Sequence, residues 1–175
     1  MNLDSKVGPY RILRLINQGG QGSVFLGYDK RLQRRVAIKI YTLSAKHGSR
    51  KQLRREAQLV ASMHSQKVVQ IYDVIESSKH LALIMEYVPG SSLEELLAAV
   101  RPSLAGVLTV GVDIAGALAL ARQQHIVHGD VKAANVLITE FGRAKLTDFG
   151  IARVVGEEPS REWAAGSFHA LSPEQ

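Results

Sequence analysis

Residues 128–138 read HGDVKAANVLI, and KLTDFG follows shortly at residues 145–150. Two carboxylates, Asp130 and Asp148, are set with Asn135 and Lys132 on loops framed by short apolar strands. Carboxylate and amide oxygens suit Mg²⁺, which also takes phosphate oxygens as ligands. A carboxylate that accepts a hydroxyl proton beside a phosphate-neutralising lysine is typical of phosphoryl transfer. Taken singly, DFG reads as an ordinary turn and His128 as a packed core histidine. It is improbable, however, that all these residues occur in this order by chance.

A glycine-rich turn precedes this stretch in the sequence, at Asn17-Gln-Gly19-Gly20-Gln-Gly22-Ser-Val24. Glycines let a backbone approach a polyphosphate closely, although a plain hairpin turn explains the pattern at least as often. A strand follows the glycines where a dinucleotide-binding loop requires a helix, and no Gly-Lys-Ser/Thr follows. Both the dinucleotide fingerprint and the P-loop are therefore excluded.

Two charges occupy apolar faces. Lys39 lies in the apolar run 36–41, on the same strand face as Ala37, and Glu56 lies on the apolar stripe of an amphipathic helix over 49–64. A desolvated charge without a partner is costly. The simplest expectation is that Lys39 and Glu56 face each other, and the alternative is that each reaches solvent.

The hydrophobic pattern predicts strands at 10–16, 23–26, 36–41, 68–75 and 81–87, and further helices at 92–100 and 103–124. Pro89-Gly90 is the best candidate for a boundary between two lobes. Segment 103–124 is apolar enough to raise the question of a membrane span. Because Asp113 at mid-bilayer would cost about 2.5–3.5 kcal/mol, a buried helix of a soluble core is expected instead.

The composition of the chain excludes several further classes of protein and of binding partner. The chain has 175 residues, a net charge of +6 and no cysteine, which excludes disulfide scaffolds and thiolate metal sites. The first twenty residues lack a secretory apolar region, so the cytoplasm is the expected compartment. Basic runs at 29–35 and 50–55 read as solvated surface without interleaved aromatic residues, and no nucleic-acid partner is expected.

These motifs, with Met85-Glu-Tyr-Val-Pro-Gly90 and Ser172-Pro-Glu174, resemble the eukaryotic-type (Hanks-type) serine/threonine protein kinases, and the bacterial members in particular. The resemblance covers 10–175. It implies an α+β fold: a five-stranded antiparallel N-lobe sheet with one helix, plus the first part of a helical C-lobe. The implied organisation is an N-terminal extension at 1–9, the N-lobe at 10–88 and a partial C-lobe at 89–175. The later helices of the family are expected to be missing.

The resemblance also implies a role for each matching residue. Asp130 would be the catalytic base and Lys132 the phosphate-contacting lysine. Lys39 would hold the ATP phosphates and pair with Glu56, and Asn135 and Asp148 would bind Mg²⁺. The other residues implied at the ATP site are Asn17, Gly19, Gly20, Gly22, Val24, Ala37, Met85, Glu86, Val88 and Leu137.

Two positions depart from the family pattern. Asn17 stands at the first glycine of the glycine-rich loop, and Gly129 replaces the arginine usual before the catalytic aspartate. The expected activity is transfer of the ATP γ-phosphoryl group to protein Ser/Thr hydroxyls. The alternatives are a non-catalytic, ATP-binding pseudokinase-like module and a small-molecule phosphotransferase of the aminoglycoside type. The protein substrate, the activating signal and the oligomeric state stay open.

Overall fold

A computed structural model of the chain describes residues 6–19, 22–42, 50–77, 80–149 and 153–154. The chain forms two compact units, one of Met1–Ala61 with Gln70–Val88 and one of Ser62–Val69 with Pro89–Gln175. One division falls between Val88 and Pro89, where the sequence predicts a lobe boundary. Residues 62–69, which that prediction assigns to the N-lobe, group with the second unit, where Val69 N donates to Leu146 O.

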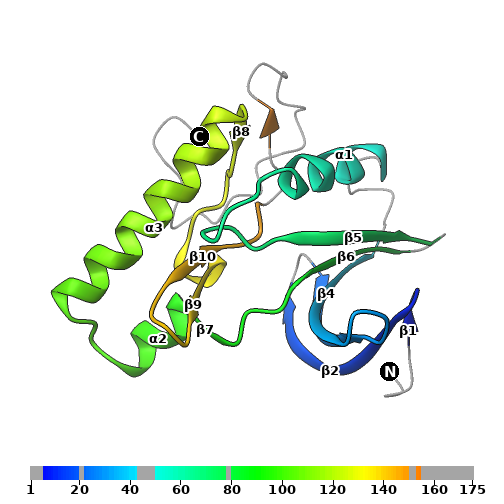
Figure 1. The fold of residues 1–175 in the computed structure, drawn as a ribbon, viewed down its shortest axis with the longest axis horizontal. Coiled ribbons are helices and arrows are strands. Elements are labelled where there is room, and N and C mark those ends of the chain that lie inside the picture. The colour runs from blue at the N-terminus through cyan, green and yellow to red at the C-terminus, as the bar shows by residue number, and fades with distance from the viewer. Residues whose placement is uncertain (1–5, 20–21, 43–49, 78–79, 150–152, 155–175) are drawn as a thin grey trace. The chain divides into compact units, whose positions relative to one another are not determined.

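The first unit is built on a curled antiparallel sheet (Figure 1). The five predicted strands are all present, and a short strand at 6–7 precedes them. This sixth strand forms because Val7 pairs with Tyr10 across a turn in which Gly8 has φ +55°. The strands in sheet order are β1 (Lys6–Val7), β2 (Tyr10–Gly19), β3 (Gly22–Asp29), β4 (Arg34–Thr42), β6 (His80–Glu86) and β5 (Ile71–Glu76).

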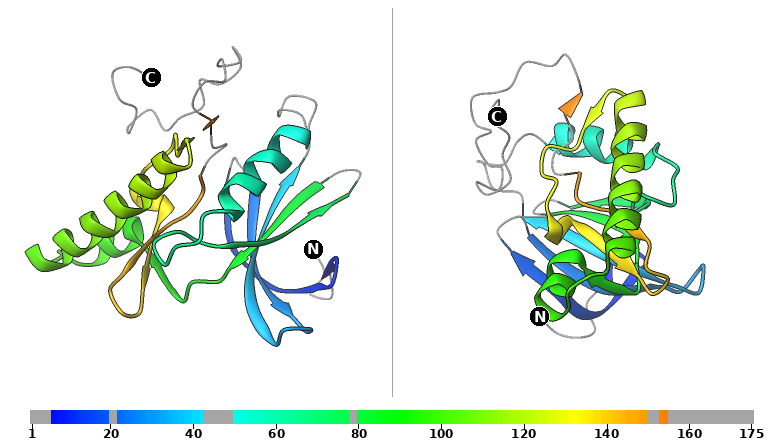
Figure 2. Two further views of the ribbon diagram at one scale, coloured as in Figure 1. Left: turned by 45° about the horizontal axis from the view of Figure 1, so that its top comes forward. Right: turned by 90° about the vertical axis from the view of Figure 1, so that its left-hand side faces the viewer.

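One face of this sheet carries the core of the first unit. Val36 and Ile38 of β4 are fully buried there, beside Phe25 of β3 and Ile84 of β6. Because strand side chains alternate, Ala37 and Lys39 project from the opposite face. The α1 helix (Arg50–Ala61) packs against β5 and buries Ala57 and Val60, which belong to the apolar stripe predicted from the sequence (Figures 1 and 2).

In the residues that the structure describes, the second unit combines two helices with short strands. Its three-stranded antiparallel sheet has the order β10 (Ala144–Leu146), β9 (Val136–Thr139), β7 (Gly90–Ser92). A second pair joins β8 (Ile126–Val127) to β11 (Arg153–Val154). The α2 helix (Leu93–Ala99) begins at a capping box in which Ser92 and Glu95 satisfy each other's backbone N–H groups. A single 3₁₀ turn, η1 (Ala133–Asn135), leads into β9.

The α3 helix (Leu104–Gln123) differs from the expectation of a buried helix. It contacts β8 and β10, and within it only Asp113, Ala117 and Ala121 are buried, while Leu104 is 75% exposed. The apolar pattern correctly predicts the helix but does not reveal how few described elements pack against it. By length and composition α3 could cross a membrane, and it is the single helix in the described part of the chain that meets this test.

Gly90 provides a test of the second unit's packing. Its φ is +156°, and a Cβ at this position would collide with the Ile138 carbonyl oxygen on β9. We therefore expect Gly90→Ala to lower the free energy of unfolding by about 1–3 kcal/mol, measured by urea denaturation followed by circular dichroism. The control is Gly111→Ala on α3, where a Cβ meets open space, and we expect a gain of about 0.5–1 kcal/mol. Equal stability of both variants would contradict this account.

Candidate active site

Four of the predicted ATP-binding residues share one face of the first unit's sheet. Val24 of β3 lies directly opposite Lys39 of β4, and Ala37 lies opposite Met85 of β6. Residues that face each other in neighbouring strands project to the same side. Ala37 and Met85 are 9% and 7% exposed, and Val24 is half-buried. This face therefore presents three apolar side chains around one lysine.

Lys39 is only 4% exposed, and its Nζ lies 5.2 Å from the centre of the Tyr41 ring. A cation over an aromatic ring is attracted to it, more strongly where water is excluded. The predicted partner, Glu56, lies in α1, but its side chain falls outside the described residues. The Lys39–Glu56 ion pair stays a prediction.

The glycine-rich turn joins β2 to β3. Gly19 pairs with Gly22 at the end of the ladder, whereas Gly20 lies outside the described residues. Asn17 is exposed and pairs with Val24, next to an irregularity in the β2–β3 register. The β2–β3 ladder therefore runs up to the Gly19–Gly22 pair, with Asn17 in an extended strand.

The segment that ends the first unit holds the predicted backbone contacts for adenine. Glu86 N donates to Gln70 O at 2.8 Å, and the Glu86 carboxylate accepts from Gln70 N at 3.3 Å. The Glu86 N–H is therefore used within the unit and not for a bound base. Val88 is 8% exposed.

In the second unit, two of the predicted residues, Lys132 and Asn135, contact the carboxylate of a third, Asp130. Lys132 Nζ lies 2.8 Å from Asp130 Oδ2. Asn135 Nδ2 donates both to Asp130 Oδ2, at 3.0 Å, and to the Asp130 carbonyl, at 2.8 Å. Asp130 and Asn135 are buried and Lys132 is partly exposed. Charge-assisted bonds of this kind fix a carboxylate more firmly than neutral ones.

His128 joins this loop to the segment that carries Asp148. Asp130 N donates to His128 Nδ1 at 3.2 Å, so in the neutral ring the proton lies on Nε2, which is 3.0 Å from Thr147 O. The ring also lies 4.5 Å from that of Phe149. Burial lowers the pKa of His128, and it outweighs the Thr147 hydrogen bond and the nearby carboxylates, which raise that pKa.

The backbone is strained at the same place. Asp148 has φ +52°, a left-handed conformation that costs a side chain free energy and is common at functional sites. Gly129 has φ +78°, and glycine adopts that angle without the penalty of a Cβ. The glycine that departs from the family pattern thus suits the backbone here. Thr147 N donates to Asn135 O at 2.9 Å, which ties Asp148 to the other predicted metal ligand.

The donor set fits a metal that arrives with phosphate. Asn135 uses Nδ2 on Asp130, which leaves the amide oxygen as its metal-binding atom, and Asp148 adds a carboxylate. Among the described residues, no three His, Asp or Glu side chains gather into a metal-binding cluster. Mg²⁺ in phosphoryl-transfer sites needs only one or two carboxylates together with phosphates and water.

Leu137, the remaining residue expected at the ATP site, lies half-buried in β9, two residues beyond Asn135.

Two contributions escaped the sequence reasoning. Thr147 acts through its backbone, which leaves no side-chain signature to find. Asp113 of α3 is buried and bound by Arg143, and its signal was present in the sequence as a lone carboxylate in an apolar helix. Taken by itself, such a carboxylate argues against a membrane span and does not reveal its partner.

Comparison with known proteins agrees with this geometry. A family model described as "Protein kinase domain" matches residues 10–175. The serine/threonine-protein kinase PrkC of Bacillus subtilis is 39% identical over 96% of the chain, and pkn2 of Myxococcus xanthus is 36% identical over 96%. PknL of Mycobacterium tuberculosis is 36% identical over 99%.

The chain spans 27% of the length of PrkC, 21% of pkn2 and 44% of PknL. The match nevertheless runs from the first long strand, through the glycine-rich turn and the Asp130 loop, to the last residue of the chain. With the antiparallel sheet and the Asp130–Lys132–Asn135 cluster, this shows that the chain belongs to the protein kinase family.

Proposed function

We propose that the chain carries the nucleotide-binding and catalytic residues of a serine/threonine protein kinase, which transfers the γ-phosphoryl group of ATP to protein hydroxyls. The observation that carries this proposal is the Asp130 carboxylate held by both Lys132 and Asn135. Further support comes from family membership and from relatives that are named serine/threonine-protein kinases.

Asp130 would act as the base. Its Oδ2 already receives Lys132 and Asn135, so the carboxylate is oriented before a substrate arrives. As the substrate hydroxyl oxygen bonds to the γ-phosphorus, Asp130 accepts the hydroxyl proton and the bond to the ADP oxygen breaks. Lys132 Nζ then stabilises the negative charge that is distributed over the transferring group.

Asn135 and Asp148 would hold Mg²⁺ through oxygen atoms. When bound there, Mg²⁺ would neutralise the negative charge of the phosphates. In the first unit, Lys39 would bind the phosphates, and the apolar face of Val24, Ala37 and Met85 would contact the adenine. The Glu86 carbonyl is the group that this residue can offer to the base, because its N–H bonds to Gln70.

The acceptor and the compartment are also part of the proposal. A lysine two residues after the catalytic aspartate is typical of the serine/threonine branch of the family, and Lys132 stands at this position. We therefore propose a protein Ser/Thr hydroxyl as acceptor, in the cytoplasm. No nucleic-acid partner is proposed.

Transfer is tested by removing one predicted phosphate or metal contact at a time. We expect Asp148→Asn and Lys39→Met each to reduce labelled phosphate transfer from γ-labelled ATP to a generic protein substrate by at least about a hundredfold. Lys39→Met removes the positive charge that would bind the phosphates, and Asp148→Asn removes the carboxylate that would hold Mg²⁺. The control is Lys30→Met, in the exposed β3–β4 turn, which should keep full activity.

The other outcomes separate the alternatives. Undiminished transfer in both variants would refute the assignment. Nucleotide binding by the wild-type protein without transfer to protein would indicate the pseudokinase-like module. Phosphorylation of an aminoglycoside in place of protein would indicate the small-molecule phosphotransferase.

Because burial favours the neutral form of His128, the free energy of unfolding should depend on pH. The pKa of His128 is lower in the folded state than the ordinary histidine value of about 6.5, so below pH 6.5 the unfolded chain binds more protons. The free energy of unfolding should fall as the pH decreases from 6.5 toward the folded-state pKa, by at most about 1.4 kcal/mol per pH unit. Urea denaturation at several pH values measures this slope.

The His128→Phe variant should lose this part of the slope, because phenylalanine does not titrate. The matched control is His125→Asn, since His125 is exposed and has φ +58°, a conformation that asparagine tolerates. An unchanged slope in His128→Phe would show that another group causes the acid sensitivity.

A further inference from the structure

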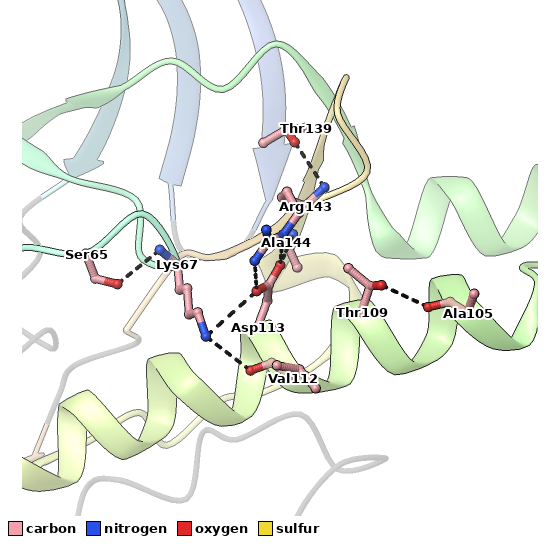
Figure 3. Close-up of polar contacts among 9 residues, drawn as sticks. All are labelled: Ser65, Lys67, Ala105, Thr109, Val112, Asp113, Thr139, Arg143 and Ala144. Carbon is pink, nitrogen blue, oxygen red and sulfur yellow. Dashed lines mark hydrogen bonds and ion pairs between the residues drawn. The ribbon is translucent and has the colours of Figure 1, made fainter.

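Asp113 is a buried carboxylate on a largely exposed helix. Its exposed fraction is 1%, and it accepts a bidentate pair of bonds from Arg143, Nε at 2.8 Å and Nη2 at 2.6 Å (Figure 3). Ala144 N donates to the same carboxylate at 3.1 Å. These bonds outweigh burial and lower the pKa of Asp113, so the group is charged and fully engaged. A charge buried in this way needs such partners to be tolerated at all.

Two of these donors belong to the hairpin that frames the candidate site. Ala144 is the first residue of β10, which ends at Leu146, two residues before Asp148. In the hairpin Ala144 pairs with Ile138 and Leu146 with Val136, the residue after Asn135. A strand rises about 3.3 Å per residue, so a one-residue slip of β10 would move Asp148 by that distance. The Ala144 N–H bond to Asp113 opposes such a slip.

The Asp113 carboxylate also contacts Lys67, whose backbone is bonded to β10. Lys67 Nζ lies 3.9 Å from Asp113 Oδ1 and 3.5 Å from Val112 O. The Lys67 carbonyl accepts from Leu146 N at 2.8 Å. Lys67 crosses α3 at Gly116, where a Cβ would collide with the lysine side chain. Asp113 therefore connects α3, residue 67 and β10 (Figure 3).

We propose that Asp113 is a positioning residue that sets the place of Asp148 and Asn135 through β10, an inference that rests on the proposed role of these two residues as Mg²⁺ ligands. The path is short. β10 leads through Thr147 into Asp148, and Thr147 is tied to Asn135 O by its N–H and to His128 by its carbonyl. A shift of Ala144 reaches both ligands through these bonds. Asp113 touches neither metal nor nucleotide in this role.

The test measures Mg²⁺-dependent nucleotide binding in the full chain, with the fluorescent ATP analogue methylanthraniloyl-ATP as probe. In Asp113→Asn, the Mg²⁺ concentration for half-maximal enhancement of binding should rise about tenfold. Affinity for the probe in EDTA should stay within about twofold of wild type, because the change acts on the metal ligands. Arg143→Gln should give a smaller shift, about threefold, since Ala144 and Lys67 still hold the carboxylate.

The matched control is Thr109→Ala, one turn earlier on α3. Thr109 donates to Ala105 O within the helix, and its removal should leave the Mg²⁺ midpoint unchanged (Figure 3). A purely structural role for Asp113 would reduce the amplitude of binding without moving the midpoint. Hydrogen exchange measured by mass spectrometry over 144–149 should accelerate in Asp113→Asn and not in Thr109→Ala.

The outcomes are distinguishable. Unshifted midpoints or unchanged exchange, with a wild type that responds to Mg²⁺, would overturn the positioning role and leave the proposed function intact. A wild type whose probe binding is indifferent to Mg²⁺ would overturn both. If Asp113→Asn does not fold, Arg143→Gln decides, because its side chain is 59% exposed, and an unshifted midpoint there would overturn the inference.

Discussion

The hydrogen bonds from Asn135 Nδ2 to Asp130 are the interaction on which the candidate site depends. Apart from one 3₁₀ turn, the loop from His128 to Asn135 has no regular ladder to hold it. Buried polar groups must nevertheless be satisfied, and here side chains satisfy them. Asn135 bonds both the carbonyl and the carboxylate of Asp130, so it fixes the backbone and the reactive group together.

This arrangement gives several residues two roles. Asn135 orients the proposed base with its nitrogen and keeps its oxygen for the proposed metal. His128 receives the Asp130 N–H on one nitrogen and bonds Thr147 O with the other, so its neutral form joins the two halves of the site. Removing either side chain would therefore affect geometry and chemistry at once. Effects of single substitutions in such a network are not expected to add.

Much of the second unit's local structure could be predicted from sequence, and the reasons are local. The Ser92 and Ser103 caps, the apolar runs of the strands and the breaking dipeptide at 89–90 all act over a few residues. The burial of α3 could not be predicted, because an apolar pattern shows that a helix can be covered but not which segments cover it. The short β1 was missed because two polar-flanked residues carry no periodicity, and its pairing depends on the turn at Gly8.

The sequence also does not reveal which partner a buried charge has, as two such charges in this chain illustrate. Lys39 and Asp113 look alike in the sequence, since each is one charge in an apolar element. The partner of Asp113 is Arg143, which lies 30 residues later in the sequence, on an exposed hairpin. Sequence distance gives no sign of that pairing, because neither residue shares a motif with the other. A buried charge therefore indicates that a partner exists, whereas only the folded chain shows whether that partner serves the scaffold or the chemistry. In the positioning role proposed for Asp113 the two purposes would meet, since the strand that it holds ends two residues before Asp148.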